Sequence, residues 1–227
     1  TAVADTTYIG YEGGVGTFEL QAGTYTTNKL LIGPGSQGVL TQTGGTLTVG
    51  QLLQIGGTSS PGTYNLDGGT LVTSSLTRGG TQGTFNFGGG TLRASADLSS
   101  SVPITLKTAG GTIDTNGFTV TLSGALSGPG SLTKTGAGVL RLSGTNSYSG
   151  GTLIQQGTVV VSSDSNLGDA AGGLSFSGGA LRWLAGFDTA RSISLLSGGG
   201  VLDTGAEDVT LSGTISGVGS LTKTGAG

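Results

Sequence analysis

The 227-residue sequence contains no cysteine, no histidine and no methionine. Without cysteine and histidine, the chain lacks thiol nucleophiles, disulfides, soft metal ligands and the usual catalytic triads. Charged residues make up only 9% of the chain and the net charge is −3, whereas an average soluble domain is roughly 25% charged. No basic stripe is present that could neutralise phosphates, so the composition argues against nucleic acid as a partner.

Long hydrophobic runs are also missing. Apart from glycine, the longest apolar run is three residues, as at Val159–Val161, whereas a membrane-spanning helix needs about 20. We therefore expect no membrane insertion by this segment. The chain starts without the charged and apolar regions of a signal peptide, and residues 221–227 stop in the middle of a repeated unit. These features lead us to expect a segment of a longer chain.

Glycine, in contrast, accounts for 49 residues, while proline accounts for only 4. Collagen is excluded because the glycines have no three-residue period. A Gly-Gly-(Thr/Ala/Val)-(Leu/Ile) unit recurs, with starts at Gly44, Gly68, Gly89, Gly110, Gly150, Gly178 and Gly199. The widest interval, from Gly110 to Gly150, corresponds to two short turns. Self-similarity at such regular intervals predicts a stack of repeated structural units.

A longer period lies on top of the short one. Residues 110–138 and 199–227 are identical at 20 of 29 positions, at an offset of 89 residues, or about four turns of 22. We therefore divide the single segment 1–227 into short Gly/Thr-rich turns over 1–83 and two copies of an 89-residue super-repeat, 84–138 and 173–227.

Between the glycines lie short segments in which apolar and polar residues alternate, as in Leu47–Val49 and Leu140–Leu142. Period-two alternation predicts half-buried strands, and glycine supplies the positive φ angles of tight corners. No stretch of ten or more residues has helical spacing. The best candidate for a short helix, Ser165–Ala171, is predicted to be a loop.

Winding the 21-residue step into a coil places equivalent residues above one another. The expected stacks are Leu71, Leu92 and Ile113; Leu181 and Leu202; Tyr64 and Phe85; and Asn65 and Asn86. The sequence therefore predicts an all-β parallel solenoid of about 11 coils, each about 20–28 residues long. The structural alternative is a multi-sheet sandwich, which does not predict a constant repeat length.

Residues 128–159 read GPGSLTKTGAGVLRLSGTNSYSGGTLIQQGTV. Leu132–Gly136, Leu142–Gly144, Asn146 and Tyr148–Thr152 carry a dense resemblance to the passenger-associated transport repeat, also called the autotransporter-associated β-strand repeat. The resemblance implies a right-handed parallel β-helix in a type V secreted bacterial passenger. Such passengers cross the outer membrane unfolded and fold outside, where folding of the repeat region helps to draw the chain across.

Many β-helices act on polysaccharides, so the 12 acidic residues are catalytic candidates. Asp114 and Asp203 occupy equivalent repeat positions, and this recurrence favours a structural turn over catalysis. Lys134 and Lys223 also recur, which favours a solvated or carbonyl-bonding lysine at a strand end over polyanion binding. No catalytic, cofactor or metal residues are predicted. Calcium is not expected, because no glycine–aspartate nonapeptide occurs.

The aromatic and amide residues give the remaining candidates. Trp183 and Phe187 lie in an insertion and are candidates for ligand contact; the alternative is that they pack under their own loop. Tyr8 and Tyr11 are expected to cover a coil end. Asn65 and Asn86 are expected to form an amide ladder, and Asn146 to bond the backbone of its turn.

These observations predict a non-enzymatic structural or adhesive segment of an autotransporter-type protein, forming a rigid stalk that is secreted or displayed at the cell surface. It would be associated with the outer membrane through a C-terminal region outside this sequence. Two alternatives remain open: a polysaccharide-acting β-helix enzyme and a self-assembling extracellular filament. The expected partners are a host or neighbouring-cell surface, a glycan or another copy of the chain, with no cofactor. The sequence does not identify the ligand.

Overall fold

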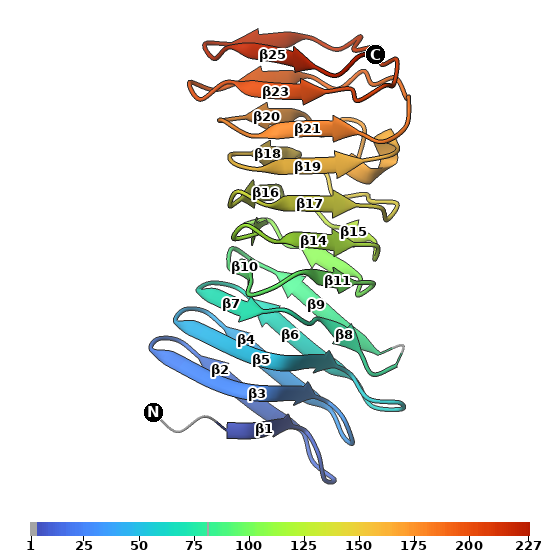
Figure 1. The fold of residues 1–227 in the computed structure, drawn as a ribbon. Helices are drawn as coiled ribbons and strands as arrows, with labels where there is room; N and C mark the ends of the chain where they lie inside the picture. Colours follow the sequence, from blue (N-terminus) through green and yellow to red (C-terminus); the bar gives the residue numbers. More distant parts are fainter. Residues whose placement is uncertain (1–3, 81) are drawn as a thin grey trace.

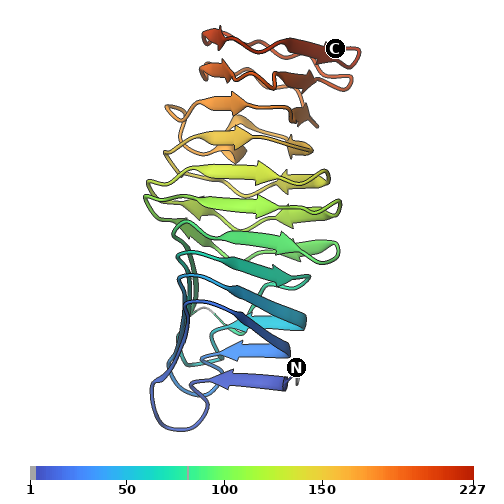
Figure 2. The same cartoon turned by 90° about the vertical axis from the view of Figure 1, so that its left-hand side faces the viewer.

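In the computed structural model, which describes residues 4–80 and 82–227, the chain winds into one stack of coils (Figure 1). The strands form three sheets of twelve, seven and six strands, here called sheets 1, 2 and 3. Their ladders are parallel, and the view turned by 90° shows the coils rising one above another from β1 to β25 (Figure 2). The predicted parallel β-solenoid is therefore confirmed, and the sandwich alternative is wrong.

Sheet 1 runs along the whole stack. It contains β1 (Ala4–Ile9), β3 (Thr24–Ile32), β5 (Thr46–Ile55), β7 (Thr70–Thr73), β8 (Thr77–Arg78), β10 (Thr91–Ala94), β13 (Gly111–Asp114), β16 (Leu132–Thr135), β18 (Thr152–Ile154), β20 (Leu174–Phe176), β22 (Ile193–Leu195) and β24 (Ile215–Gly217).

Sheets 2 and 3 cover parts of the stack. Sheet 2 contains β11 (Leu98–Ser100), β14 (Thr119–Leu122), β17 (Val139–Leu142), β19 (Thr158–Val161), β21 (Ala180–Trp183), β23 (Gly200–Asp203) and β25 (Leu221–Thr224). Sheet 3 contains β2 (Gly16–Leu20), β4 (Gly38–Gln42), β6 (Gly62–Leu66), β9 (Gly83–Phe87), β12 (Ile104–Leu106) and β15 (Leu126–Ser127).

The shape of the coil changes along the stack. The first coils have two sides, because the long strands β3 and β5, of 9 and 10 residues, alternate with the strands of sheet 3. The first half of β5 then pairs with β7 and its last two residues pair with β8. From β10 onward a coil passes from sheet 1 to sheet 2 and then along a third side (Figure 1).

The predicted register is confirmed. Leu71 pairs with Leu92 and Leu92 with Ile113, Leu181 pairs with Leu202, and Tyr64–Asn65 pairs with Phe85–Asn86.

The length of one coil varies less than expected. Along sheet 1, the shortest step between paired residues joins Ser175 to Ser194, and the longest joins Thr46 to Thr70. The upper end of the expected range came from the interval between Gly150 and Gly178, which is not one coil: Gly150 precedes β18 in sheet 1, whereas Gly178 precedes β21 in sheet 2. Counted along sheet 1, the stack has about ten turns, which is close to the expected number of about 11.

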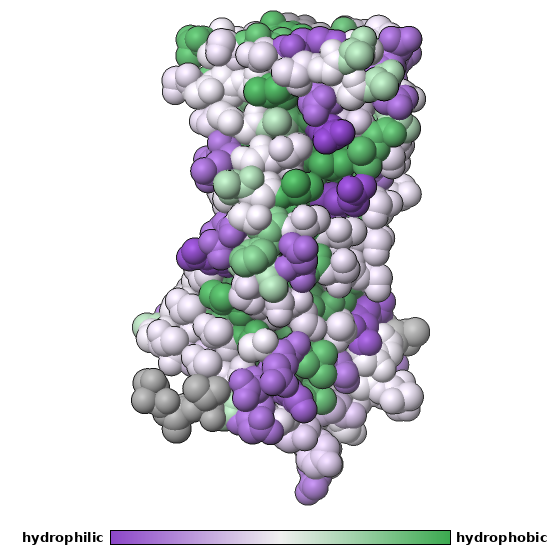
Figure 3. All heavy atoms as spheres, viewed as in Figure 1, coloured by the Kyte–Doolittle hydropathy of each residue, from purple (hydrophilic) through white to green (hydrophobic). Residues whose placement is uncertain are grey.

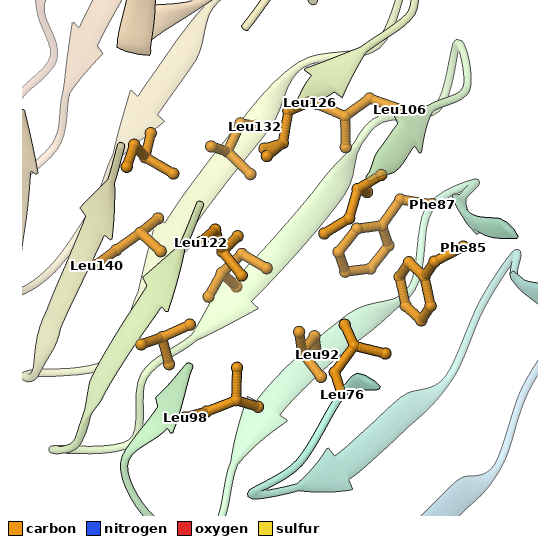
Figure 4. Packing of buried hydrophobic residues seen from close by; sticks show 14 of the residues in the cluster. Leu76, Phe85, Phe87, Leu92, Leu98, Leu106, Leu122, Leu126, Leu132 and Leu140 are labelled. Atoms are coloured by element: carbon orange, nitrogen blue, oxygen red, sulfur yellow. The ribbon is translucent and has the colours of Figure 1, made fainter. Parts of the chain in front are cut away.

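The core is one continuous hydrophobic column inside the coils. Side chains alternate in and out along each strand, so the apolar residue of each pair points inward. Figure 4 shows part of the column, in which residues such as Leu76, Phe85, Leu92 and Leu140 converge from different walls of the coil. Burying each leucine contributes about 2 kcal/mol. Because each coil contacts mainly its neighbours, this stabilisation accumulates coil by coil.

The two super-repeat copies lie on different faces of the solenoid. β13, which contains Asp114, belongs to sheet 1, whereas β23, which contains the equivalent Asp203, belongs to sheet 2. Four further strands of sheet 1 (β16, β18, β20 and β22) precede β23. The super-repeat offset therefore corresponds to four coils plus one further face, and not to four whole turns. Equivalent surface residues in the two copies point in different directions.

One short helix interrupts the strands. The predicted loop at Ser165–Ala171 begins instead with a single 3-10 turn, η1 (Asp164–Leu167). Ser163 and Asn166 form a reciprocal capping box that satisfies backbone N–H groups at its start, which is why this short turn forms. Among the described residues, no helix is long and apolar enough to span a bilayer.

Candidate functional site

The candidate functional site is the coil and a half formed by residues 128–161, with strands β16 to β19. Its sequence carries the family resemblance, so the partners of its signature residues indicate what the repeat does. These residues comprise Lys134, Asn146, Tyr148, Thr152 and several glycines.

Lys134 has a completely buried side chain. Its ammonium Nζ donates to the Thr115 hydroxyl at 2.8 Å and to the carbonyls of Thr135, Gly136 and Gln156 at 2.7, 2.6 and 3.0 Å. Burial lowers the pKa of Lys134 to about 8, and the charge of Asp114 acts in the opposite direction. The side chain therefore remains charged at neutral pH and ties three successive coils together. Of the two structural alternatives, Lys134 shows carbonyl bonding and not solvation.

Lys223 lies on another face, in β25, where its side chain is exposed. Its Nζ donates to the carbonyl of Gly225 at 3.0 Å and to the carbonyl of Gly227. Both lysines therefore bind backbone carbonyls of the turn that follows their own strand, which is a structural role.

Asn146 and Tyr148 hold the long corner between β17 and β18. The Asn146 Oδ1 accepts from the backbone N–H of Leu126 at 2.8 Å, and its Nδ2 donates to the carbonyl of Asn166 at 2.5 Å. Asn146 therefore bonds to backbone, but to that of the preceding and following coils and not to that of its own turn as expected. The buried Tyr148 hydroxyl shares a hydrogen bond of 2.7 Å with the Thr152 hydroxyl. Burial raises the pKa of Tyr148 to about 12, although its hydrogen bond to Thr152 acts in the opposite direction.

Two glycines of the repeat are required by close approach of neighbouring coils. A Cβ on Gly130 would lie 1.9 Å from the carbonyl oxygen of Lys107, and a Cβ on Gly138 would lie 1.9 Å from that of Phe118. In both cases the obstacle is backbone, which cannot rotate away. The glycines of the resemblance are therefore places where two coils touch.

The recurring aspartates are bound to the preceding coil. Asp114 pairs with Arg93 and Asp203 with Arg182, each at 3.5 Å between carboxylate and guanidinium. Each aspartate also accepts a backbone N–H two residues later, from Asn116 at 2.9 Å and from Gly205 at 3.0 Å. These contacts agree with the structural-turn interpretation of the recurrence. Within the described ranges, no group of three or more acidic residues is arranged to hold a metal ion.

The expected loop position of the aromatic pair is corrected by the structure. Trp183 is the last residue of β21 and points inward, so its side chain is only 2% exposed. Phe187 is half-buried and packs against it with ring centroids 6.1 Å apart. The strand alternation that buries Leu181 also buries Trp183. The indole therefore offers no exposed ring for ligand contact.

Two other sequence predictions have different outcomes. Asn86 Nδ2 donates to Asn65 Oδ1 at 2.8 Å, which confirms the amide ladder. Tyr8 and Tyr11 contact each other, with ring centroids 4.8 Å apart, but they are 51% and 55% exposed. Because Tyr8 and Tyr11 point outward into solvent, they do not cover a coil end as a cap would.

Sequence reasoning missed a buried arginine. Arg191 is 3% exposed and forms a bidentate pair with Asp164, at 2.8 and 2.9 Å. Its guanidinium also donates to the carbonyls of Asp164, Gly168, Asp169 and Gly172. The arginine thereby fastens the η1 segment to the next coil. A signal was available in the sequence, because the equivalent position of the first super-repeat copy holds the apolar Val102, which is buried.

An open hollow of about 520 Å³ lies beside Asp114, at the corner where the coil leaves sheet 1. Its lining residues are Asp114, Asn116, Gly117, Thr135, Gly136, Ala137 and Gln156. Both polar and apolar atoms line the hollow, and three of its lining residues, Thr135, Gly136 and Gln156, provide backbone carbonyls that Lys134 binds.

Comparison with known proteins identifies the repeat. Residues 132–161 match the family model of the passenger-associated-transport-repeat, within the region 128–159 that carried the resemblance and two residues beyond it. The chain is also similar to the adhesin BmaC autotransporter of Brucella suis biovar 1 (strain 1330), with 46% identity over 100 residues. That alignment covers 44% of this chain and 3% of the length of the Brucella protein. No solved structure matches the chain.

Proposed function

Starting from a chain that carries the passenger-associated transport repeat of autotransporter passengers, we propose that it is a rigid, non-enzymatic stalk segment of a bacterial surface adhesin. The stalk is secreted or displayed at the cell surface. Its coil-by-coil folding helps to draw the passenger outward.

One observation carries this proposal: the signature side chains of the repeat bond within the protein itself. Lys134, Asn146 and Tyr148 are buried. Lys134 and Asn146 bond to backbone groups, including those of neighbouring coils, and the Tyr148 hydroxyl bonds to the Thr152 hydroxyl. Residues that are used in this way stabilise the stacking of coils and are not available to a substrate. A solenoid with neighbour-only contacts can fold progressively from one end, which suits a chain that emerges as a thread.

The surface supports an adhesive role better than an enzymatic one. Figure 3 shows a face of mostly near-neutral hydropathy, with strongly polar residues scattered over it rather than gathered in one cleft. Four of the 12 acidic residues are paired with arginine or lysine, at Asp67, Asp114, Asp164 and Asp203.

The filament alternative has no specific observation in its favour.

The proposal is tested by substituting two neighbouring residues of β17 whose side chains point in opposite directions. Leu140 is completely buried, and Leu140→Ala is expected to cost about 2–5 kcal/mol of stability. The matched control, Arg141→Ala, removes an exposed side chain from the same strand. In the parent protein, surface-exposed passenger is quantified by antibody labelling of intact cells, against total passenger in lysates.

The expected result is a several-fold loss of surface-exposed passenger for Leu140→Ala and no loss for Arg141→Ala. Equal surface levels for both variants, despite measured destabilisation by Leu140→Ala, would rule out a contribution of folding to secretion. Beads that carry the segment on their surface then test adhesion to cells separately.

A further inference from the structure

The two super-repeat copies differ most at one outward turn. Residues 116–119 read NGFT in the first copy and residues 205–208 read GAED in the second. These are four consecutive differences, whereas 20 of the 29 compared positions are identical. Proteins often place their binding residues on loops that vary in sequence while the fold that supports them stays the same. Surface turns also vary without function, so the position of this turn decides the interpretation.

The turn forms one wall of the 520 Å³ hollow, which spans three successive coils. This volume lies in the range of small-molecule sites, about 300–1,000 Å³. The Phe118 N–H donates to the Thr115 carbonyl at 2.8 Å, closing a tight turn in which Asn116 has a φ of 50°. Asn116 is the one non-glycine residue with positive φ in the described part of the chain. Asparagine tolerates this conformation better than most residues, so the turn is built for this side chain.

The walls of the hollow are held in place before any ligand arrives. Arg93 donates to the Asn116 Oδ1 at 2.9 Å, and the Asn116 Nδ2 donates to the Ala94 carbonyl at 3.1 Å. Asp114 is held by the same arginine and by the Asn116 N–H. These bonds fix the orientation of one carboxylate and one carboxamide, which reduces the entropic cost of binding.

One polar group on the opposite wall is free. The Gln156 side-chain amide is exposed and makes no hydrogen bond to other described residues, while its own backbone carbonyl is held by Lys134. The residues that line the hollow carry a carboxylate, two carboxamides and a hydroxyl, at Asp114, Asn116, Gln156 and Thr135. Such groups both donate and accept hydrogen bonds over a short span.

The chemistry of these groups selects the ligand. The nearby cations are already used, because Lys134 is buried and Arg93 is paired with Asp114. An anionic sugar would meet an aspartate on a chain of net charge −3. We propose that the hollow is a subsite for one neutral sugar unit of a surface glycan. This assignment deepens the proposed adhesive function and rests on it.

The affinity of one such open subsite is expected to be weak, with a Kd on the order of 1 mM. Useful adhesion then comes from many copies of the protein on one cell. The second copy of the super-repeat presents its different turn, 205–208, on another face of the rod, so the two turns do not form one continuous site.

The test uses the full 227-residue chain and compares two variants with a control. The first variant replaces residues 116–119 by the turn of the second copy (Asn116→Gly, Gly117→Ala, Phe118→Glu and Thr119→Asp), which this scaffold already carries elsewhere. The second is Gln156→Ala, which changes one exposed side chain. The control, Thr105→Ala, lies on the outward face of β12 in sheet 3. Circular dichroism checks that each variant is folded.

The protein is titrated with neutral oligosaccharides of glucose, galactose, mannose and N-acetylglucosamine, and with uronate oligosaccharides. The backbone amide shifts at positions 117 and 136 are followed by NMR. We expect at least one neutral sugar to shift these amides, with about tenfold weaker binding in both variants and unchanged binding in Thr105→Ala. The subsite would be overturned if no neutral sugar shifts these amides at a concentration 20-fold above the expected Kd of ~1 mM. It would also be overturned if folded Gln156→Ala binds the sugar as tightly as the original chain, or if the protein binds uronates more tightly than neutral sugars. Such a failure leaves the stalk proposal to its own test on surface display.

Discussion

Arg191→Met is expected to lower the free energy of unfolding by about 3–5 kcal/mol. Methionine fills part of the space but cannot bond to Asp164 or to the carbonyls of Gly168, Asp169 and Gly172. Those carbonyls lose their donors inside the protein, and each buried group left unpaired costs about 1–3 kcal/mol. The η1 segment should then become sensitive to proteases before the rest of the rod.

The matched control is Arg182→Met, which breaks the exposed pair with Asp203 and is expected to change stability by at most about 1 kcal/mol. The free energy of unfolding of both variants is measured by urea unfolding at neutral pH. If the two variants lose the same small amount, Arg191 does not hold the η1 segment as described.

The Arg191 pair also carries a pH dependence. Burial raises the pKa of Asp164, but the hydrogen bonds from Arg191 and Thr189 and the charge of Arg191 outweigh it, so the net pKa is lowered. A carboxyl group whose pKa is lowered in the folded state stabilises the protein at pH values above the pKa that it has in the unfolded chain, which is near 3.8. That contribution is lost as the pH falls through the folded value. Arg191→Met should therefore lose less stability on acidification than the original chain.

Gly130→Ala is expected to destabilise the protein by about 3 kcal/mol or more, at the upper end of overpacking costs. The added methyl group would lie 1.9 Å from the Lys107 carbonyl oxygen, so two neighbouring coils must separate. Gly14→Ala is the matched control, because nothing lies within 4 Å of the position that its Cβ would take. Chemical unfolding of both variants measures the difference. Similar midpoints for the two alanine variants would contradict the close approach of coils at Gly130.

The stacking could be predicted from the sequence because each coil repeats the same inward pattern. Leu71, Leu92 and Ile113 recur at equal spacing because one coil needs that length of chain, and they pair as expected. The same reasoning failed for the longer super-repeat period, since sequence identity does not show whether a period closes after a whole turn. Counting strands by sheet reveals the extra face that separates Asp114 from Asp203.

The candidate site was harder to predict than the fold. Alternation buries Trp183, but the residue was assigned to a loop because its neighbours form an insertion. The hollow beside Asp114 depends on how three successive corners lie over one another, the first of which is longer than the other two, and no local pattern shows this arrangement. Arg191 occupies an inward position that holds Val102 in the first copy. The Asp164 carboxylate and the carbonyls of residues 168–172 make a charge tolerable there.

The direct measurement of coil stacking uses spin labels on one outward ladder of sheet 1. In this ladder, Leu153 lies four strands above Thr70, and Ser194 lies six strands above it. The chain has no cysteine, so each double cysteine variant is labelled only at the chosen pair. Parallel stacking predicts separations of about 19 and 29 Å between these backbone positions, at about 4.8 Å per strand. Separations that do not increase with the number of intervening strands, as hairpin pairing would give, would contradict the stacked solenoid.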